Sequence, residues 1–351
     1  MSSVSWFAQA LAPWYAANRR SLPWRSTRDP YLIWLSEVIL QQTRVDQGLA
    51  YYNRFALKYP TVHHLAAATE DEVLKDWQGL GYYSRARNMR ATAQRIVSEY
   101  RGVFPEDHNG LRHLKGIGPY TAAAIASIAF NEPVAVVDGN VFRVLARCFG
   151  IREPIDRPAG KRLVADLASR LLDRKHPGEH NQAVMELGAL VCTPKRPQCN
   201  ACPVRSRCLA YEEGVVEQLP LKVGRTKVRE RHFNYLLPHG VSALWLVKRA
   251  AGDIWQGLYT PPMVESDVRW GARRMQAALQ QELGRSWHLV GSFTEERHVL
   301  SHQVIHARFW WVSKARTARL PADWLACGLK DAHRYPVPRL VERVLGEVLN
   351  S

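Results

Sequence analysis

Residues 114–121 have the sequence LKGIGPYT and stand between two stretches with helical apolar spacing. Gly116 and Gly118 allow a tight turn whose backbone N–H groups stay open, and Pro119 starts the next helix. A turn of this kind at a helix N-terminus is an uncharged site for a phosphate. A plain connection between two helices has the same short pattern, so the residues around the turn must decide between the two.

A single carboxylate follows the glycine turn at the end of an apolar run. Residues 134–141 have the sequence VAVVDGNV, in which Asp138 precedes another helical stretch. Asp in that place is commonly a helix N-cap. A helix N-terminus also helps to keep a carboxylate ionised, as a site that stabilises positive charge requires. From these residues alone, both interpretations of Asp138 stay open.

Glu37 is the second carboxylate of interest, and it lies in a segment that predicts a helix over residues 29–47. The segment begins with Asp-Pro, an N-cap followed by proline at the first helical position. The helical neighbours of Glu37 are mostly apolar, among them Ile33 and Trp34. A carboxyl buried on such a face has a raised pKa and donates a proton near neutral pH.

Four cysteines crowd into one short loop with the spacing C-x6-C-x2-C-x5-C, namely Cys192, Cys199, Cys202 and Cys208. A structural zinc site usually has two C-x2-C pairs with a longer spacer. The unequal outer spacings here favour a cubane iron–sulfur cluster, in which each iron takes one thiolate. Zinc is the alternative. Lysine and arginine between the cysteines make the loop basic and suited to phosphates.

The composition sets the class of protein and of partner. The chain has 351 residues, which predicts about two domains. Its 46% hydrophobic and 23% charged residues are ordinary for a globular protein. The net charge of +16 suits a polyanionic partner. The N-terminal residues lack a secretory signal pattern and no apolar run reaches membrane-spanning length, so we expect a cytoplasmic protein, nucleoid-associated if bacterial, with no membrane partner.

The pattern of apolar and polar residues changes beyond the cysteine loop. Helices are expected near residues 70–78, 84–100, 119–130, 140–149, 160–173 and 180–191. Residues 212–231 are polar and basic and predict a linker. Strands are expected at residues 233–237, 242–248, 288–293 and 304–311, with one helix near 269–283. Helices followed by a mixed segment indicate two domains.

These parts together resemble the helix-hairpin-helix DNA glycosylases with an iron–sulfur loop, the endonuclease III superfamily, over about residues 6–210. Within it, four further stretches are similar to MutY-type adenine DNA glycosylases. They are a pocket motif (RSLPWR, 20–25), a catalytic and wedge helix (SEVILQQTRV, 36–45), an intercalating loop (GLGYYSRA, 79–86) and a catalytic turn (VDGNV, 137–141). In combination these stretches are highly specific.

The resemblance implies a role for each matched residue. The catalytic residues would be Glu37, Asp138, Asn140 and Tyr120. Contacts to DNA would come from Gln41, Gln42, Tyr82, Gly116, Gly118, Ser301 and His302. The adenine pocket would be lined by Arg20, Leu22, Trp24, Arg25, Val45 and Gln182. One 4Fe-4S cluster would be held by Cys192, Cys199, Cys202 and Cys208.

The implied fold is a mainly α helix-hairpin-helix glycosylase domain with an iron–sulfur loop, followed by an α+β Nudix-like domain. The first domain would span residues 1–211, with a six-helix barrel at about 22–135 and a cluster subdomain at about 1–21 and 136–211. Residues 232–351 would form the Nudix-like domain that reads 8-oxoguanine. Residues 277–284 (AALQQELG) lack most acids of the Nudix metal helix, so we expect no pyrophosphatase chemistry.

Two positions refine the expected reaction. Bifunctional relatives carry a lysine two residues after the second hairpin glycine, which forms a Schiff base with the sugar, and this chain has Tyr120 there. We therefore expect a monofunctional glycosylase. The family's lesion-reading Phe-Ser-His turn is matched by Ser301 and His302, with Leu300 in place of the aromatic residue. The expected partner is duplex DNA with adenine opposite 8-oxoguanine or guanine, bound by a monomer.

Three alternatives remain from the sequence. A thymine glycosylase for G·T mispairs would also carry Tyr at the hairpin, but it would resemble only the first domain. An endonuclease III-like lyase is disfavoured by Tyr120. A non-catalytic DNA-binding or redox-sensing cluster protein would not need both Glu37 and Asp138.

Overall fold

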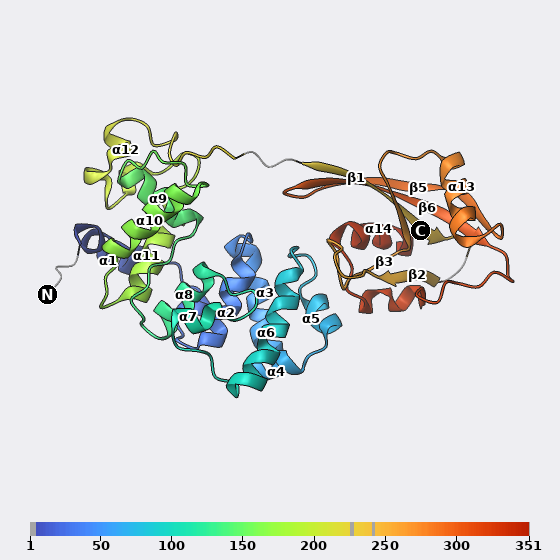
Figure 1. Ribbon diagram of the computed structural model, residues 1–351, viewed down its shortest axis with the longest axis horizontal. Coiled ribbons are helices and arrows are strands. Elements are labelled where there is room, and N and C mark those ends of the chain that lie inside the picture. Colours follow the sequence, from blue (N-terminus) through green and yellow to red (C-terminus); the bar gives the residue numbers. More distant parts are fainter. Residues whose placement is uncertain (1–4, 225–227, 241–242, 351) are drawn as a thin grey trace. The chain divides into compact units, whose positions relative to one another are not determined.

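The computed structural model describes residues 5–224, 228–240 and 243–350 (Figure 1). These residues form two compact units. The first comprises the described residues up to Ala67 together with Asn88–Gly224. The second comprises Ala68–Arg87 and the described residues beyond Gly224.

The first unit is helical, with short 3-10 turns between the helices (Figure 1). Its elements are α1 (Trp6–Asn18), η1 (Pro23–Arg25), α2 (Pro30–Leu40), α3 (Val45–Lys58), α4 (Val62–Ala67), α7 (His108–Arg112), α8 (Pro119–Ala129), α9 (Gly139–Cys148), α10 (Pro158–Leu171), α11 (Pro177–Leu190), η2 (Cys199–Ala201), η3 (Arg205–Arg207) and α12 (Leu209–Glu212). Helix α6 (Ser84–Tyr100) begins in the second unit and continues into the first. The helices expected near residues 84–100, 119–130, 140–149, 160–173 and 180–191 are confirmed to within a few residues.

The core of the first unit lies where α1, α9, α10 and α11 meet. Phe7, Leu11, Leu145 and Leu187 are almost fully buried there. Helix α2 is buried over most of its length, and Trp34 is 1% exposed. Burial of a large apolar side chain stabilises a fold by about 1.5–3 kcal/mol, so α2 is a firm support for the side chains it carries.

The prediction of a single helix over residues 29–47 is wrong. Asp29 caps α2 by accepting from the backbone N–H of Tyr31 at 2.8 Å, as expected, but α2 ends at Leu40. Gln42 adopts a positive φ of 58°, and α3 begins afterwards in a new direction. A Cβ on Gly48 would come within 2.6 Å of the Leu40 side chain, so glycine lets α3 cross closely over the end of α2. The apolar spacing continued through this break and did not reveal it.

The second unit contains two sheets and flanking helices (Figure 1). One sheet has the strand order β4-β1-β6-β5, and the other has the order β3-β2-β7. The strands are β1 (Arg229–Pro238), β2 (Ala243–Lys248), β3 (Tyr259–Thr260), β4 (Met263–Ser266), β5 (Trp287–Val299), β6 (Gln303–Lys314) and β7 (Leu325–Gly328). The helices are α5 (Glu70–Asp76), α13 (Ala272–Leu283), η4 (Leu329–Arg334) and α14 (Arg339–Asn350).

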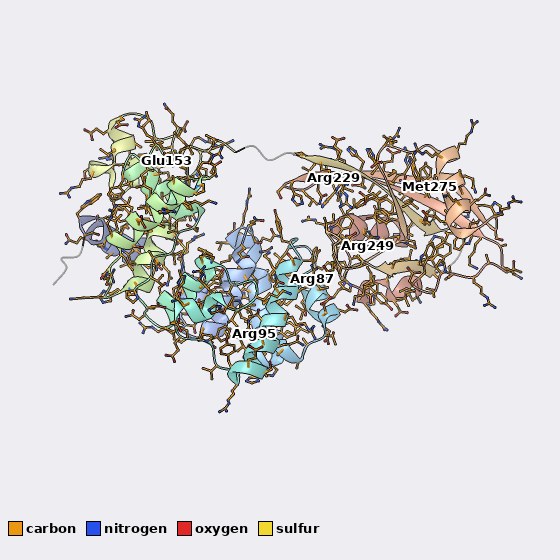
Figure 2. All side chains as sticks on the ribbon, viewed as in Figure 1. Arg87, Arg95, Glu153, Arg229, Arg249 and Met275 are labelled. Atoms are coloured by element: carbon orange, nitrogen blue, oxygen red, sulfur yellow. The ribbon has the colours of Figure 1, made fainter. Side chains whose placement is uncertain are left out.

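Strands β1 and β6 are parallel, whereas β4 and β5 pair antiparallel with their neighbours. Helix α13 carries Met275 (Figure 2), which is fully buried. It belongs to one core cluster with Trp287 on β5 and Trp310 on β6. The strand expected at 233–237 begins earlier, at Arg229, so the last residues of the expected linker belong to β1. Charged residues at this end of the strand hid its start, because backbone pairing with β6 does not require apolar side chains.

Residues 68–87 belong to the second unit through specific polar contacts. Asp71 on α5 forms an ion pair with Lys248 at 2.6 Å. Gln78 donates to a carboxylate oxygen of Glu342 on α14, also at 2.6 Å. This segment of the helical half of the sequence is therefore fastened to the strands and helices of the C-terminal half.

No helix within the described ranges is both long and apolar enough to cross a membrane.

Candidate active site

The first unit has a cavity of about 500 Å³ among α2, α8, α9, α11 and the η1 turn. Its walls include every residue that the sequence assigns to catalysis or to the adenine pocket. These are Arg20, Leu22, Trp24, Arg25, Glu37, Val45, Tyr120, Asp138, Asn140 and Gln182. Residues separated by more than 160 positions thus meet in one place.

Glu37 lies on the buried face of α2 and is 8% exposed. The Tyr120 hydroxyl donates a hydrogen bond of 2.5 Å to Glu37 Oε2. Burial raises the pKa of Glu37 to about 7, and the hydrogen bond from Tyr120 opposes this rise. A carboxyl in this state holds a proton near neutral pH and can donate it.

Asp138 is the N-cap of α9, which agrees with the first of its two interpretations from the sequence. Its Oδ1 accepts from the backbone N–H of Val141 at 2.8 Å, and its Oδ2 accepts from the Asn140 amide at 2.7 Å. The pKa of Asp138 is raised, chiefly by burial, and these donors oppose part of the rise. The cavity therefore holds two carboxyl groups in different settings, one bonded by a single phenol and one by several N–H groups.

Arg20 and Arg25 point at a residue that the sequence analysis missed, Glu186 on α11. Each guanidinium forms an ion pair of 2.6 Å with this carboxylate, which is 1% exposed. Burial alone would raise the pKa of Glu186, but the hydrogen bonds from Arg25 and Arg20 outweigh it and bring the pKa to about 2. Glu186 is four residues after Gln182, so the helical spacing was the one available signal.

The remaining pocket residues supply an apolar wall and an amide. Trp24 is 8% exposed and packs edge-on against Tyr52, with ring centroids 5.0 Å apart. The Gln182 side-chain oxygen accepts from the hydroxyl of Tyr15 at 2.9 Å. Since that oxygen is occupied, the NH₂ group of Gln182 remains for a ligand in the cavity.

The glycine turn separates α7 from α8 as expected. Gly116 has a φ of +79°, and a Cβ there would meet Asn88 at 2.9 Å. Gly118 is the N-cap of α8, and a Cβ there would meet nothing within 4 Å. Open space over the backbone of Gly118 leaves the helix N-terminus accessible to an anion.

Gln41 and Gln42 form the corner after α2. The Gln41 amide donates to the hydroxyl of Thr121 on α8 at 3.2 Å, whereas Gln42 is exposed. Gln41 therefore links this corner to α8, whereas the Gln42 side chain is exposed to solvent.

In the second unit, Tyr82 and Ser301 are in contact. The two hydroxyl oxygens are 3.0 Å apart, although the residues are 219 positions apart. Gly81 and Tyr82 have positive φ angles of 73° and 48°, which turn the loop so that the Tyr82 ring is 45% exposed. His302 Nδ1 lies 3.2 Å from Ser301 Oγ. The sequence assigned these three residues to DNA contact, but it gave no sign that they touch one another.

The four cysteines form no disulfide bonds and are partly exposed. Burial raises the pKa of Cys202 to about 11, and the charges of Cys192 and Cys208 contribute to this rise. Arg147, which is 2% exposed, donates to Cys192 Sγ at 3.4 Å and to the carbonyl of Thr193 at 2.7 Å. Among the described residues, no three His, Cys, Asp or Glu side chains converge as ligands of a single metal ion.

Comparisons with known proteins match both halves of the chain. The HhH-GPD superfamily of base excision DNA repair proteins matches residues 35–167, and the NUDIX domain family matches residues 235–347. An adenine DNA glycosylase of Buchnera aphidicola subsp. Baizongia pistaciae is 30% identical over 310 residues, covering 87% of this chain and 86% of the relative. The chain belongs to the adenine DNA glycosylase family. The expected fold, a mainly helical helix-hairpin-helix domain followed by an α+β Nudix-like domain, is thereby confirmed.

Relatives from animals align with part of this chain. The adenine DNA glycosylase of Mus musculus is 43% identical over 243 residues, covering 67% of this chain. The matched segment spans slightly less than half, 47%, of the mouse protein.

Solved structures share the fold of the first half. The structure of a thermostable thymine-DNA glycosylase has a TM-score of 0.54 and 28% identity, covering 59% of this chain and 95% of that one. An endonuclease III–DNA complex has a TM-score of 0.52 at 23% identity, which shows the shared fold alone.

Proposed function

We propose that this protein excises adenine paired with 8-oxoguanine or guanine in duplex DNA, by hydrolysis of the N-glycosidic bond and without cutting the strand. The observation that carries the proposal is the 2.5 Å hydrogen bond between Tyr120 and the buried Glu37, inside a cavity that also holds Asp138. The names of the matched relatives support adenine as the target. Tyrosine at position 120 has no amine for a Schiff base, which supports the absence of lyase chemistry.

Glu37 would act as the general acid. Neutral adenine is a poor leaving group, so Glu37 would protonate N7 and let the base depart uncharged. The sugar then develops oxocarbenium character, which the Asp138 carboxylate would stabilise electrostatically or through a transient covalent bond. Glu37, now ionised, would accept a proton from the attacking water. Tyr120 would hold the Glu37 carboxylate, and Asn140 would hold that of Asp138.

The base pocket follows from the same cavity. A flipped adenine would lie among Leu22, Trp24 and Val45, with the Gln182 amide available for a ring nitrogen. Glu186 would keep Arg20 and Arg25 in fixed positions at the pocket wall. Buried ion pairs of this kind orient a site more than they stabilise a fold.

Duplex DNA would be held by several separate elements. The turn at Gly116 and Gly118 offers backbone N–H groups to a phosphate, and the net charge of +16 supplies salt-sensitive affinity. Gln41 and Gln42 would fill the space left by the flipped base. In the second unit, Tyr82 would enter the base stack, and Ser301 with His302 would read the opposite base. We expect the protein to bind as a monomer.

The cysteine loop would hold one 4Fe-4S cluster through Cys192, Cys199, Cys202 and Cys208. The unequal spacing C-x6-C-x2-C-x5-C supports a cubane, in which each iron takes one thiolate, over a single zinc ion. The buried guanidinium of Arg147 beside Cys192 would offset part of the negative charge of the thiolates. When bound, the cluster would brace the basic loop, since base hydrolysis itself transfers no electrons.

The test is single-turnover excision on four duplexes: adenine opposite 8-oxoguanine, adenine opposite guanine, thymine opposite guanine, and adenine opposite thymine. We expect alkali-dependent cleavage at adenine, fastest opposite 8-oxoguanine. Glu37→Gln should bind the mispair and lose excision, whereas Glu99→Gln, an exposed change on α6, should retain it. Excision by Glu37→Gln at the unmodified rate, or strand cutting without alkali, would contradict the mechanism.

Thymine at G·T mispairs is a second candidate substrate because the thymine-DNA glycosylase structure matches the first half of the chain. The thymine duplex tests it directly. Cleavage at thymine alone would replace adenine as the target and leave the acid role of Glu37 to be tested on that substrate.

A further inference from the structure

We infer that Gln303 fixes the tautomer of His302 and thereby sets how strictly the turn at residues 300–303 distinguishes 8-oxoguanine from guanine. The inference rests on the proposed function, because it assumes that Ser301 meets the base opposite adenine. It assigns a positioning role to Gln303, Arg231 and Glu265. None of these three residues was singled out by the sequence motifs.

The turn itself has a fixed backbone. The N–H of Leu300 donates to the carbonyl of Gln303 at 2.8 Å, which closes the hairpin between β5 and β6. The N–H of Arg229, at the start of β1 (Figure 2), donates to the carbonyl of His302 at 3.1 Å. These backbone hydrogen bonds hold the main chain of the turn on both sides.

The orientation of the Gln303 amide is set from the sheet. Glu265 on β4 accepts two hydrogen bonds from Arg231, at 2.7 and 2.6 Å, so the guanidinium is held firmly. Arg231 Nη1 lies 3.4 Å from Gln303 Oε1. A guanidinium has only donors, so the amide atom facing it must be the oxygen. Gln303 is 4% exposed, and its NH₂ group therefore points the other way.

That NH₂ group faces the imidazole of His302. Gln303 Nε2 lies 3.4 Å from His302 Nε2. An amide NH₂ can only donate, so His302 Nε2 must accept, and the neutral ring carries its hydrogen on Nδ1. Nδ1 lies 3.2 Å from Ser301 Oγ and consequently donates to it. In this chain of hydrogen bonds, Arg231 donates to Gln303, Gln303 donates to His302, and His302 donates to the Ser301 oxygen.

This order leaves Ser301 able to meet either base. One lone pair of Ser301 Oγ is taken by His302, so its own hydrogen and a second lone pair remain. The Tyr82 hydroxyl oxygen lies 3.0 Å from Ser301 Oγ and can both donate and accept. It can therefore bond either the Ser301 hydrogen or the second lone pair, whichever the ligand does not use. The N7 of 8-oxoguanine carries a hydrogen and needs an acceptor, whereas the N7 of guanine needs a donor. Ser301 can satisfy both.

The other tautomer would make Ser301 selective. With the hydrogen on Nε2, His302 Nδ1 becomes an acceptor and takes the hydrogen of Ser301. The serine oxygen then offers lone pairs alone, which match the N7–H of 8-oxoguanine and repel the N7 of guanine. Gln303 therefore makes the turn tolerant of guanine, and its removal should make the turn stricter.

The decisive variant is Gln303→Met, which keeps the unbranched shape and removes the amide. Free histidine prefers the hydrogen on Nε2, so His302 should change tautomer. The ratio of single-turnover excision rates, adenine opposite 8-oxoguanine over adenine opposite guanine, should rise about five-fold, the factor carried by one neutral hydrogen bond. Gln276→Met on α13 is the matched control and should leave the ratio unchanged. Arg231→Met, which frees the Gln303 amide to rotate, should raise the ratio by a smaller factor.

Nitrogen-15 NMR of histidine-labelled protein in alkaline buffer reads the tautomer without any substrate. The His302 signals, assigned by their loss in His302→Asn, should show Nδ1 protonated in the unmodified protein and Nε2 protonated in Gln303→Met. Nε2 protonation in the unmodified protein, or a tautomer change with a constant rate ratio, would overturn the inference. Absence of adenine excision with the expected tautomer would instead contradict the proposed function.

Discussion

Removal of one phenolic hydroxyl should shift the pH profile of excision. In Tyr120→Phe, Glu37 loses the 2.5 Å hydrogen bond that lowers its pKa. A hydrogen bond to an ionised group contributes about 1.5 kcal/mol or more, and 1.36 kcal/mol corresponds to one pKa unit. Because Glu37 is buried, water screens little of the free energy of this hydrogen bond. The pKa of Glu37 should therefore rise by about one unit.

The two profiles should differ in opposite ways at low and high pH. Excision needs protonated Glu37, so the unmodified rate should fall as the pH rises through about 7. In Tyr120→Phe the falling limb should lie about one unit higher, since the acid keeps its proton longer. At low pH the variant should be slower, by up to about ten-fold, because the carboxylate that forms during proton transfer is less stabilised. The deficit should shrink or disappear at high pH.

The assay is single-turnover excision across pH on the duplex with adenine opposite 8-oxoguanine, developed with alkali. Tyr31→Phe is the matched control, because Tyr31 is a buried tyrosine whose hydroxyl donates to the carbonyl of Tyr59, outside the cavity. Its profile should keep the unmodified midpoint. A midpoint in Tyr120→Phe that stays in place, or moves to lower pH, would refute the assignment of the limb to Glu37 and of the shift to Tyr120.

Three further predictions follow from burial and backbone geometry. Above pH 7, Glu37→Gln should raise the free energy of unfolding by up to roughly 3 kcal/mol, because ionisation of the buried carboxyl costs the free energy that corresponds to a pKa shift from 4.5 to about 7. Near pH 4, denaturant unfolding should show no gain in stability, because Glu37 is protonated in both the folded and the unfolded form. Gly118→Ala should keep its unfolding midpoint and weaken DNA binding, whereas Gly116→Ala should lose about 1–2 kcal/mol of stability because of its positive φ and the contact with Asn88; equal stability of the two variants would contradict this account. The purified protein should contain about four irons per chain with matching sulfide, and Cys199→Ser should lower both; one zinc per chain would replace the cluster by a single-ion site.

The sequence predicted local features well because their causes are local. The cap at Asp29, the N-cap role of Asp138 and the start of α8 at Pro119 each depend on a few neighbouring residues. Strand-like runs of residues likewise located β1, β2, β5 and β6, whereas the short strands β3, β4 and β7 were not predicted. Such signals need no knowledge of the tertiary structure.

The sequence missed one helix break and one site residue. The break after Leu40 is accompanied by a close approach of Gly48 to the Leu40 side chain, which apolar spacing does not reveal. Glu186 became a site residue only when Arg20 and Arg25, more than 160 positions away, met it. For Glu186 a partner more than 160 positions away decided the outcome, so a pattern of residues along one helix could not show it.

The attachment of residues 68–87 to the second unit limits how the gene for this protein can be divided. A break in the coding sequence after Gly224 would separate Asp71 from Lys248 and Gln78 from Glu342. The C-terminal half is therefore not an independent cassette. Recombination that exchanged it for another Nudix-like domain would lose these contacts unless the incoming surface matched residues 68–87, which are encoded hundreds of bases upstream.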